Sequence, residues 1–192
     1  MSIVGNLRSV QDADLDAVLE RPERVKRLVY NEPLGRDDAN SRPLLARFRR
    51  RKHEPEDDWG PADDGEHLDL DKAWQGLHFL LTGTDMGGDP PLNFIYRPEN
   101  WIGDVDVGLG PARAVRSGEV RMIADELERL PPETLAERFD PEKMMELGIY
   151  PEIWDRDPAE DDTLGYLLHH YGELRAFVRR AADGGRAMIV YF

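Results

Sequence analysis

Trp74 and His78 are four residues apart, a spacing that places both side chains on the same face of a helix. An imidazole beside an indole could act as a general base or help to bind a planar ligand. The same spacing is also common for a core tryptophan that packs above a hydrogen-bonded histidine. His78 is therefore the candidate catalytic residue of this sequence, with a structural role as the alternative.

A glycine-rich turn is predicted at Gly108-Leu-Gly-Pro-Ala-Arg113. Gly108 and Gly110 would let the backbone approach a ligand closely, and Arg113 could hold a carboxylate or phosphate with two parallel hydrogen bonds. The segment lacks the third glycine of a dinucleotide-binding fingerprint and the Gly-Lys-Ser/Thr of a P-loop. The alternative is a turn in which the arginine ties loops together.

Other polar clusters carry weaker chemical signals. His169 and Glu173 share one side of a helix, as metal ligands can, but the spacing supplies no third ligand. The aspartate pairs do not follow the spacing of a calcium-binding loop. We therefore predict no metal and no cofactor, and we leave the roles of His169, His170 and the carboxylate pairs open.

Charge and composition exclude several classes of partner. The chain has 192 residues, a formal net charge of −14 and no cysteine. Such acidity argues against binding to nucleic acid or to an anionic membrane, although residues 42–52 form a basic run. No apolar stretch is long enough to span a membrane, and the N-terminus does not resemble a secretory signal. We therefore expect a cytoplasmic protein.

Periodicity indicates more helix than strand. Apolar residues recur at helical spacing in five segments, and Pro132 and the Asp140-Pro141 pair are the start signals of two more short helices. Residues 31–66 show little periodicity and predict an irregular excursion. The predicted helices cover 10–20, 22–30, 67–83, 117–130, 132–139, 140–148 and 162–182. The predicted strands cover 1–4, 92–96, 104–107 and 187–192, and the last is apolar enough to be buried on both faces. The fold class is therefore mixed α/β in a single domain, residues 1–192, with a small mixed sheet covered by helices.

Several segments together resemble the YfbM-like family of bacterial proteins, a domain of unknown function. They are Leu68–Trp74, Leu77-His78, Leu80–Gly83, Gly108–Arg113, Arg138–Pro141, Ile149–Pro151 with Trp154, and the helix of residues 164–182 before a short strand. The resemblance implies a three-layer fold and a small bacterial cytoplasmic protein, but no activity. Gln75 stands where family members often have a second histidine, so a histidine pair is not expected here.

Two functions remain open, and whether the chain is an enzyme is uncertain. The first is a binding protein whose acidic surface engages a basic protein partner, as an immunity-type protein would mask a basic toxin. Residues 53–192 carry 13 basic and 31 acidic side chains, a net charge of −18, and Trp59, Trp101 and Trp154 are candidate exposed anchors.

The second candidate function is that of a small enzyme or ligand sensor that binds an anionic small molecule. Its pocket would be formed by Trp74, His78, Gly108, Gly110, Arg113, Tyr150 and Trp154.

Overall fold

One antiparallel sheet organises the chain. The computed structural model describes residues 2–30 and 59–192. The strands are β1 (Asn6–Val10), β2 (His67–Asp69), β3 (Trp101–Asp106), β4 (Pro111–Val115) and β5 (Ala187–Tyr191). Their order is β2-β1-β5-β4-β3, and each neighbouring pair is antiparallel. The sequence had suggested a sheet of mixed strand direction, and that prediction was wrong.

The C-terminal strand lies at the centre of the sheet, as its apolar sequence predicts. All five residues of β5 are buried. Successive side chains of a strand point to opposite faces, and those of β5 enter two different cores. Ala187, Ile189 and Tyr191 join one core cluster. Met188 and Val190 join the other, together with Phe192 just beyond the strand.

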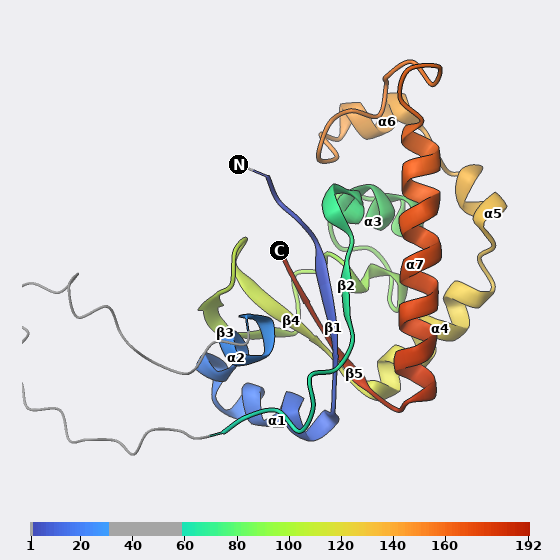
Figure 1. The fold of residues 1–192 in the computed structure, drawn as a ribbon. Coiled ribbons are helices and arrows are strands. Elements are labelled where there is room, and N and C mark those ends of the chain that lie inside the picture. Colours follow the sequence, from blue (N-terminus) through green and yellow to red (C-terminus); the bar gives the residue numbers. More distant parts are fainter. Residues whose placement is uncertain (1, 31–58) are drawn as a thin grey trace, which may run out of the picture.

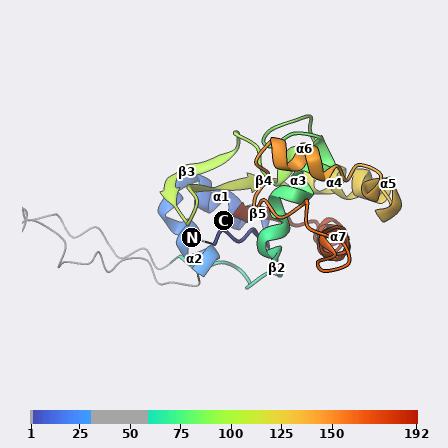
Figure 2. The same cartoon turned by 90° about the horizontal axis from the view of Figure 1, so that it is seen from above.

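Helices cover both faces of the sheet (Figures 1 and 2). On one face, the core contains α1 (Asp12–Glu20) and α2 (Val25–Tyr30), joined by the 3-10 turn η1 (Pro22–Arg24). On the other, it contains the long helix α7 (Thr163–Asp183), α4 (Ser117–Glu128) and α3 (Trp74–Thr82). Two short helices, α5 (Pro132–Ala136) and α6 (Pro141–Glu146), precede α7. The mixed α/β class, the helical layers and the excess of helix over strand are confirmed.

Several predicted boundaries were wrong. The first strand begins at Asn6 rather than lying within 1–4, and its pairing continues to Val10, so α1 begins at Asp12. Residues 92–96 form the 3-10 turn η4 (Leu92–Phe94) instead of a strand. The Asn93 side-chain amide donates to the Gly88 carbonyl at 3.0 Å, so it ties the turn to the preceding loop. A third 3-10 turn, η3 (Asp71–Ala73), leads into α3.

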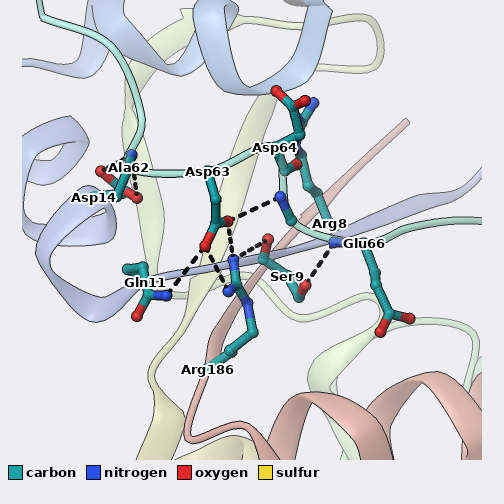
Figure 3. Close-up of polar contacts among 10 residues, drawn as sticks. Arg8, Ser9, Gln11, Asp14, Ala62, Asp63, Asp64, Glu66 and Arg186 are labelled. Carbon is teal, nitrogen blue, oxygen red and sulfur yellow. Dashed lines mark hydrogen bonds and ion pairs between the residues drawn. The ribbon is translucent and has the colours of Figure 1, made fainter.

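Residues 62–66 are fastened to β1 and α1 (Figure 3). The Ser9 hydroxyl accepts a hydrogen bond from Glu66 N at 2.9 Å, and the Asp14 carboxylate accepts one from Ala62 N at 3.1 Å. Arg186 donates to the Asp63 carboxylate at 2.9 Å. This segment is therefore ordered, whereas the rest of the predicted excursion, 31–58, and the basic run within it lie outside the described residues.

Candidate functional site

Arg113 lies beneath a group of aromatic rings. It belongs to β4 and is 3% exposed. Its Cζ atom lies 5.0 Å from the ring centroids of Tyr96 and Trp101 and 5.1 Å from that of Phe192. Each ring face attracts the cation through its quadrupole. The arginine predicted to grip a ligand is thus enclosed by side chains of its own chain.

The Arg113 charge has no carboxylate partner among the described residues. Its Nε donates to the Arg97 carbonyl at 2.8 Å, but the buried Nη1 has no hydrogen-bond partner there. The neighbouring Arg97 differs, because it forms an ion pair with Glu119. Burial lowers the pKa of Arg113, and the Arg97 charge acts in the same direction against the opposing effect of Tyr96. A buried guanidinium without an acidic partner is costly.

His78 lies in the core of the protein. It is 0% exposed, and neither of its ring nitrogens has a hydrogen-bond partner in the described part of the chain. Burial lowers the pKa of His78 to about 4, against opposing effects of Asp85 and Gly87, so the ring is neutral at neutral pH. Its placement leaves no direct contact between this imidazole and solvent.

Trp74 connects the buried residues to the N-terminal segment. Its ring centroid lies 4.5 Å from that of Phe192, 5.1 Å from that of Tyr96 and 6.0 Å from that of Tyr150. The indole nitrogen donates to the Ile3 carbonyl at 3.3 Å, and the Tyr150 hydroxyl accepts from Ile3 N at 3.0 Å. Phe192 therefore contacts both Trp74 and Arg113, whereas Tyr150 joins the cluster through Trp74.

Trp154 belongs to a different part of the core, and its proposed role as an exposed anchor was wrong. Its side chain is 1% exposed, and its indole nitrogen donates to the Ile149 carbonyl at 2.7 Å. A Cβ atom added to Gly76 would lie 2.7 Å from the Trp154 ring, so the helix α3 fits tightly against it. Trp101, in contrast, is 42% exposed.

Gly108, the first glycine of the predicted turn, closely approaches Phe192. Gly108 has φ of 137°, and a Cβ atom there would lie 1.8 Å from the Phe192 carbonyl oxygen. Leu109 N donates to that same oxygen at 2.9 Å. The Asp106 carboxylate accepts from Gly108 N at 2.9 Å and from Gly110 N at 3.1 Å. The turn therefore uses these three amides for internal hydrogen bonds.

A surface hollow of about 280 Å³ lies beside this turn. Its walls are mainly apolar, and one of its lining residues, Phe192, also contacts Arg113. Tyr30 and Leu109 are 46% and 41% exposed at the hollow. The lining residues are Ser2, Ile3, Val4, Asn6, Tyr30, Val107, Gly108, Leu109, Tyr191 and Phe192. Trp101 belongs to the same β3–β4 hairpin, and its ring lies 3.6 Å from a Cβ atom placed on Gly110. We call the hollow and Trp101 together the hairpin surface.

Sequence patterns identified only part of this arrangement. Trp101, Gly108 and Arg113 were singled out, but Ile3, Tyr96 and Phe192 were not. These three residues come from distant segments, and no local spacing links them. The sequence signal for this site was the turn itself, because its two glycines are followed by Arg113, the arginine that the rings enclose.

A second, larger hollow of about 870 Å³ lies near the start of α7. Its carboxylates include Asp140 and Asp162, which accept hydrogen bonds from Lys143 N and Gly165 N and so cap α6 and α7. No group of three metal-ligating side chains occurs within residues 2–30 and 59–192. His170 Nδ1 lies 3.2 Å from the Glu173 carboxylate, and His169 Nε2 lies 3.7 Å from it.

The comparisons with known proteins define the family of the chain. Residues 1–191 match the family described as a domain of unknown function, DUF1877, and the chain belongs to that family. Protein YfbM of Escherichia coli strain K12 is 30% identical over 128 residues, which are 64% of this chain and 75% of YfbM. The resemblance inferred from the sequence motifs is therefore confirmed.

A solved structure shows the same fold. The crystal structure described as a protein of unknown function, YfbM from Escherichia coli, has a TM-score of 0.64 with 20% sequence identity, and the match covers 98% of each chain. At this identity the likeness concerns the fold alone. Within the described part of the chain, no helix has the length and apolar character needed to cross a membrane.

Proposed function

We propose that the chain binds a basic protein partner at the hairpin surface. The observation that carries this proposal is the apolar hollow bordered by the exposed side chains of Tyr30 and Leu109, with Trp101 exposed on the same β3–β4 hairpin. Protein interfaces concentrate their binding energy in a few aromatic or apolar anchors that fill pockets and exclude water. A hollow of about 280 Å³ is large enough for one such side chain of a partner.

The charge around the hollow selects the kind of partner. None of the ten residues that line it is basic. Asp69 is paired with the lining residue Asn6 across β1 and β2, and Asp106 immediately precedes the lining residue Val107. Asp69, Asp104 and Asp106 are all exposed. Lysine or arginine side chains around an apolar anchor would complement these carboxylates and accelerate association.

The overall charge supports the same chemistry. A net charge of −14 attracts a basic protein from a distance, and this attraction weakens as salt screens it. Masking of a basic toxin by an immunity-type protein is one form that this function takes. The proposal includes a cytoplasmic location, where the chain would encounter a basic cytoplasmic partner.

A selection from random displayed peptides tests the proposal without a known partner. We expect peptides with one aromatic or branched aliphatic residue flanked by Lys or Arg. Leu109→Asp should abolish their binding, whereas Leu147→Asp, with 39% exposure at the original leucine compared with 41% for Leu109, should preserve it. Enrichment of acidic peptides, or equal binding to both variants, would overturn the proposal.

A further inference from the structure

The larger hollow, of about 870 Å³, is lined by more acidic than basic side chains. Its acidic residues come from the segment around the start of α6 and from the chain that leads into α7, which Figure 1 shows at the end of the molecule remote from α1. They are Glu137, Asp140, Glu142, Asp155 and Asp162. We call this hollow the acidic hollow.

No described cation compensates this charge. Arg156 is the one basic residue among those that line the acidic hollow, and it already pairs with Asp161, which lies outside the lining. Among the described residues, Glu137, Glu142 and Asp155 have no ion pair and no side-chain hydrogen bond. Carboxylates gathered around a concave surface raise the local concentration of cations. The acidic hollow is therefore suited to a positively charged ligand.

A buried hydroxyl group at the acidic hollow also has no partner. Thr163 lines the hollow and is 5% exposed, and no described residue forms a hydrogen bond with its hydroxyl. Its Oγ1 atom is not sealed from solvent, unlike the unpartnered ring nitrogens of His78. Buried hydroxyl groups normally have a hydrogen-bond partner, because an unmade bond there costs free energy. Thr163 thus offers a hydrogen-bonding group to a molecule that enters the hollow.

The carboxylate next to this hydroxyl is only partly used. Asp162 Oδ1 accepts the capping hydrogen bond from Gly165 N at 2.7 Å, so its Oδ2 can accept another. Asp140 has the same arrangement, because its Oδ1 accepts from Lys143 N at 3.0 Å. Each of the two segments that line the acidic hollow therefore presents carboxylate oxygens that can accept further hydrogen bonds.

The chemistry of the lining selects primary ammonium groups. An alkylammonium group has three N–H donors and no acceptor, so carboxylate oxygens and the Thr163 hydroxyl oxygen can satisfy it together. One such group would leave most of the negative charge uncompensated, whereas two would reach both segments. The apolar part of the lining would contact the methylene groups between them, and it consists of Phe139, Pro141, Trp154, Pro158 and Leu164. The volume of the hollow lies within the range of small-molecule sites.

We propose that the acidic hollow binds a short aliphatic diamine. One ammonium group binds at the start of α7, to Asp162 and Thr163, and the other binds on the α6 side, to Asp140 and Glu142. The hydrocarbon chain between them lies against the apolar lining. This site is independent of protein docking, because the acidic hollow and the hollow of the hairpin surface share no lining residue.

Calorimetric titration of the whole chain with 1,5-diaminopentane at low salt tests the role of the hydroxyl. The wild-type protein should bind one diamine saturably. Thr163→Val keeps the shape of the side chain but removes the hydroxyl, so the affinity should fall at least about threefold. Thr163→Ser restores a hydroxyl and should bind like wild type. Equal affinities of the valine and serine variants, or no saturable binding by wild type, would overturn the proposal.

A second pair of variants separates this site from the overall acidity of the chain. Glu142 and Glu146 are both exposed on α6, but only Glu142 lines the acidic hollow. Glu142→Gln should weaken diamine binding by about threefold, whereas Glu146→Gln should leave it unchanged. The same loss in both variants would assign the binding to net charge and would overturn the proposal.

Related ligands and NMR identify the bound groups. Pentylamine should bind more weakly than the diamine, and 1,5-pentanediol should not bind. Methylene protons of the diamine should show intermolecular contacts with the Phe139 ring and the Leu164 methyl groups. Equal binding of pentylamine, contacts at another site, or tighter binding of a trilysine peptide would overturn the assignment to a small diamine. Leu109→Asp should bind the diamine like wild type, so failure of the docking proposal is distinguishable from failure of this one.

Discussion

The Phe192 ring contacts the Arg113 guanidinium, and Phe192 also lines the surface hollow beside the Gly108–Gly110 turn. The ring centroid is 5.1 Å from Arg113 Cζ, and the residue is 9% exposed. Its carbonyl accepts the hydrogen bond from Leu109 N that holds the turn in place. Phe192, which directly follows the central strand β5, therefore links the core to the proposed docking surface.

Two substitutions at Arg113 should have different effects on stability. Arg113→Ala removes the side chain that fills the space among three rings, and we expect a loss of about 2–5 kcal/mol in the free energy of unfolding. Arg113→Met retains most of the volume and removes a buried charge, so the free energy of unfolding should stay close to that of wild type. Urea unfolding checks both variants. A methionine variant as unstable as the alanine variant would contradict the packing role.

Gly108 should be intolerant of any side chain. Gly108→Ala would place a Cβ atom 1.8 Å from the Phe192 carbonyl oxygen at a φ of 137°. We expect a loss of about 1–3 kcal/mol from backbone strain alone. Gly118→Ala is the control, because a Cβ atom in α4 would meet nothing within 4 Å there. The control should raise the free energy of unfolding by up to about 1 kcal/mol, and equal losses at both sites would argue against the close approach.

His78 should make the protein sensitive to mild acid. Burial lowers the pKa of His78 to about 4 from a model-peptide value of 6.5. The unfolded chain therefore takes up a proton first as the pH falls. Stability from this residue is complete above pH 6.5 and is lost progressively towards pH 4, by about 3 kcal/mol.

The difference between wild type and His78→Leu isolates this effect. Chemical unfolding measured between pH 4 and 7 should show a steeper pH dependence for wild type than for the variant. The carboxylates titrate in both proteins, so their contribution cancels in the comparison. Parallel pH curves would mean that the folded His78 ring takes up protons as readily as an exposed one.

The ion pair between Asp63 and Arg186 should contribute modestly to stability. The hydrogen bond from Arg186 holds the pKa of Asp63 well below its ordinary value, so the contribution is present above the unfolded carboxylate's pKa and is lost as the pH falls below it. Both side chains retain solvent exposure, and a double-mutant cycle with Asp63→Asn and Arg186→Met should give a coupling of about 0.2–1 kcal/mol. The coupling should shrink in high salt, and a coupling that does not would contradict the exposed placement.

Local sequence patterns predicted the helices and strands better than they predicted the tertiary contacts between them. The run of residues 187–192 predicted a doubly buried strand because nearly every side chain there is apolar. Residues 92–96 are also largely apolar, yet they form a 3-10 turn, since the Asn93 amide bonds back to the Gly88 carbonyl. Short apolar runs do not distinguish these outcomes, which depend on tertiary contacts.

The candidate site shows the same limit. Trp74 and His78 were correctly placed on one helix, but their common burial depends on Tyr96, which comes from a separate turn. Arg113 was singled out by its turn, whereas its enclosure requires Phe192 from the far end of the chain. Such contacts have no local sequence signal, so the distinction between a ligand-gripping arginine and an enclosed one had to come from the fold.

The most direct test of docking at the hairpin surface is quantitative capture of the native partner at low salt. Wild type, Leu109→Asp and Leu147→Asp would be compared, and the bound proteins identified by mass spectrometry. The account predicts a basic protein that is retained by wild type and by Leu147→Asp, and is depleted at least about tenfold with Leu109→Asp, a change of about 1.4 kcal/mol in binding free energy. Equal retention by the two variants, or an acidic partner, would contradict it.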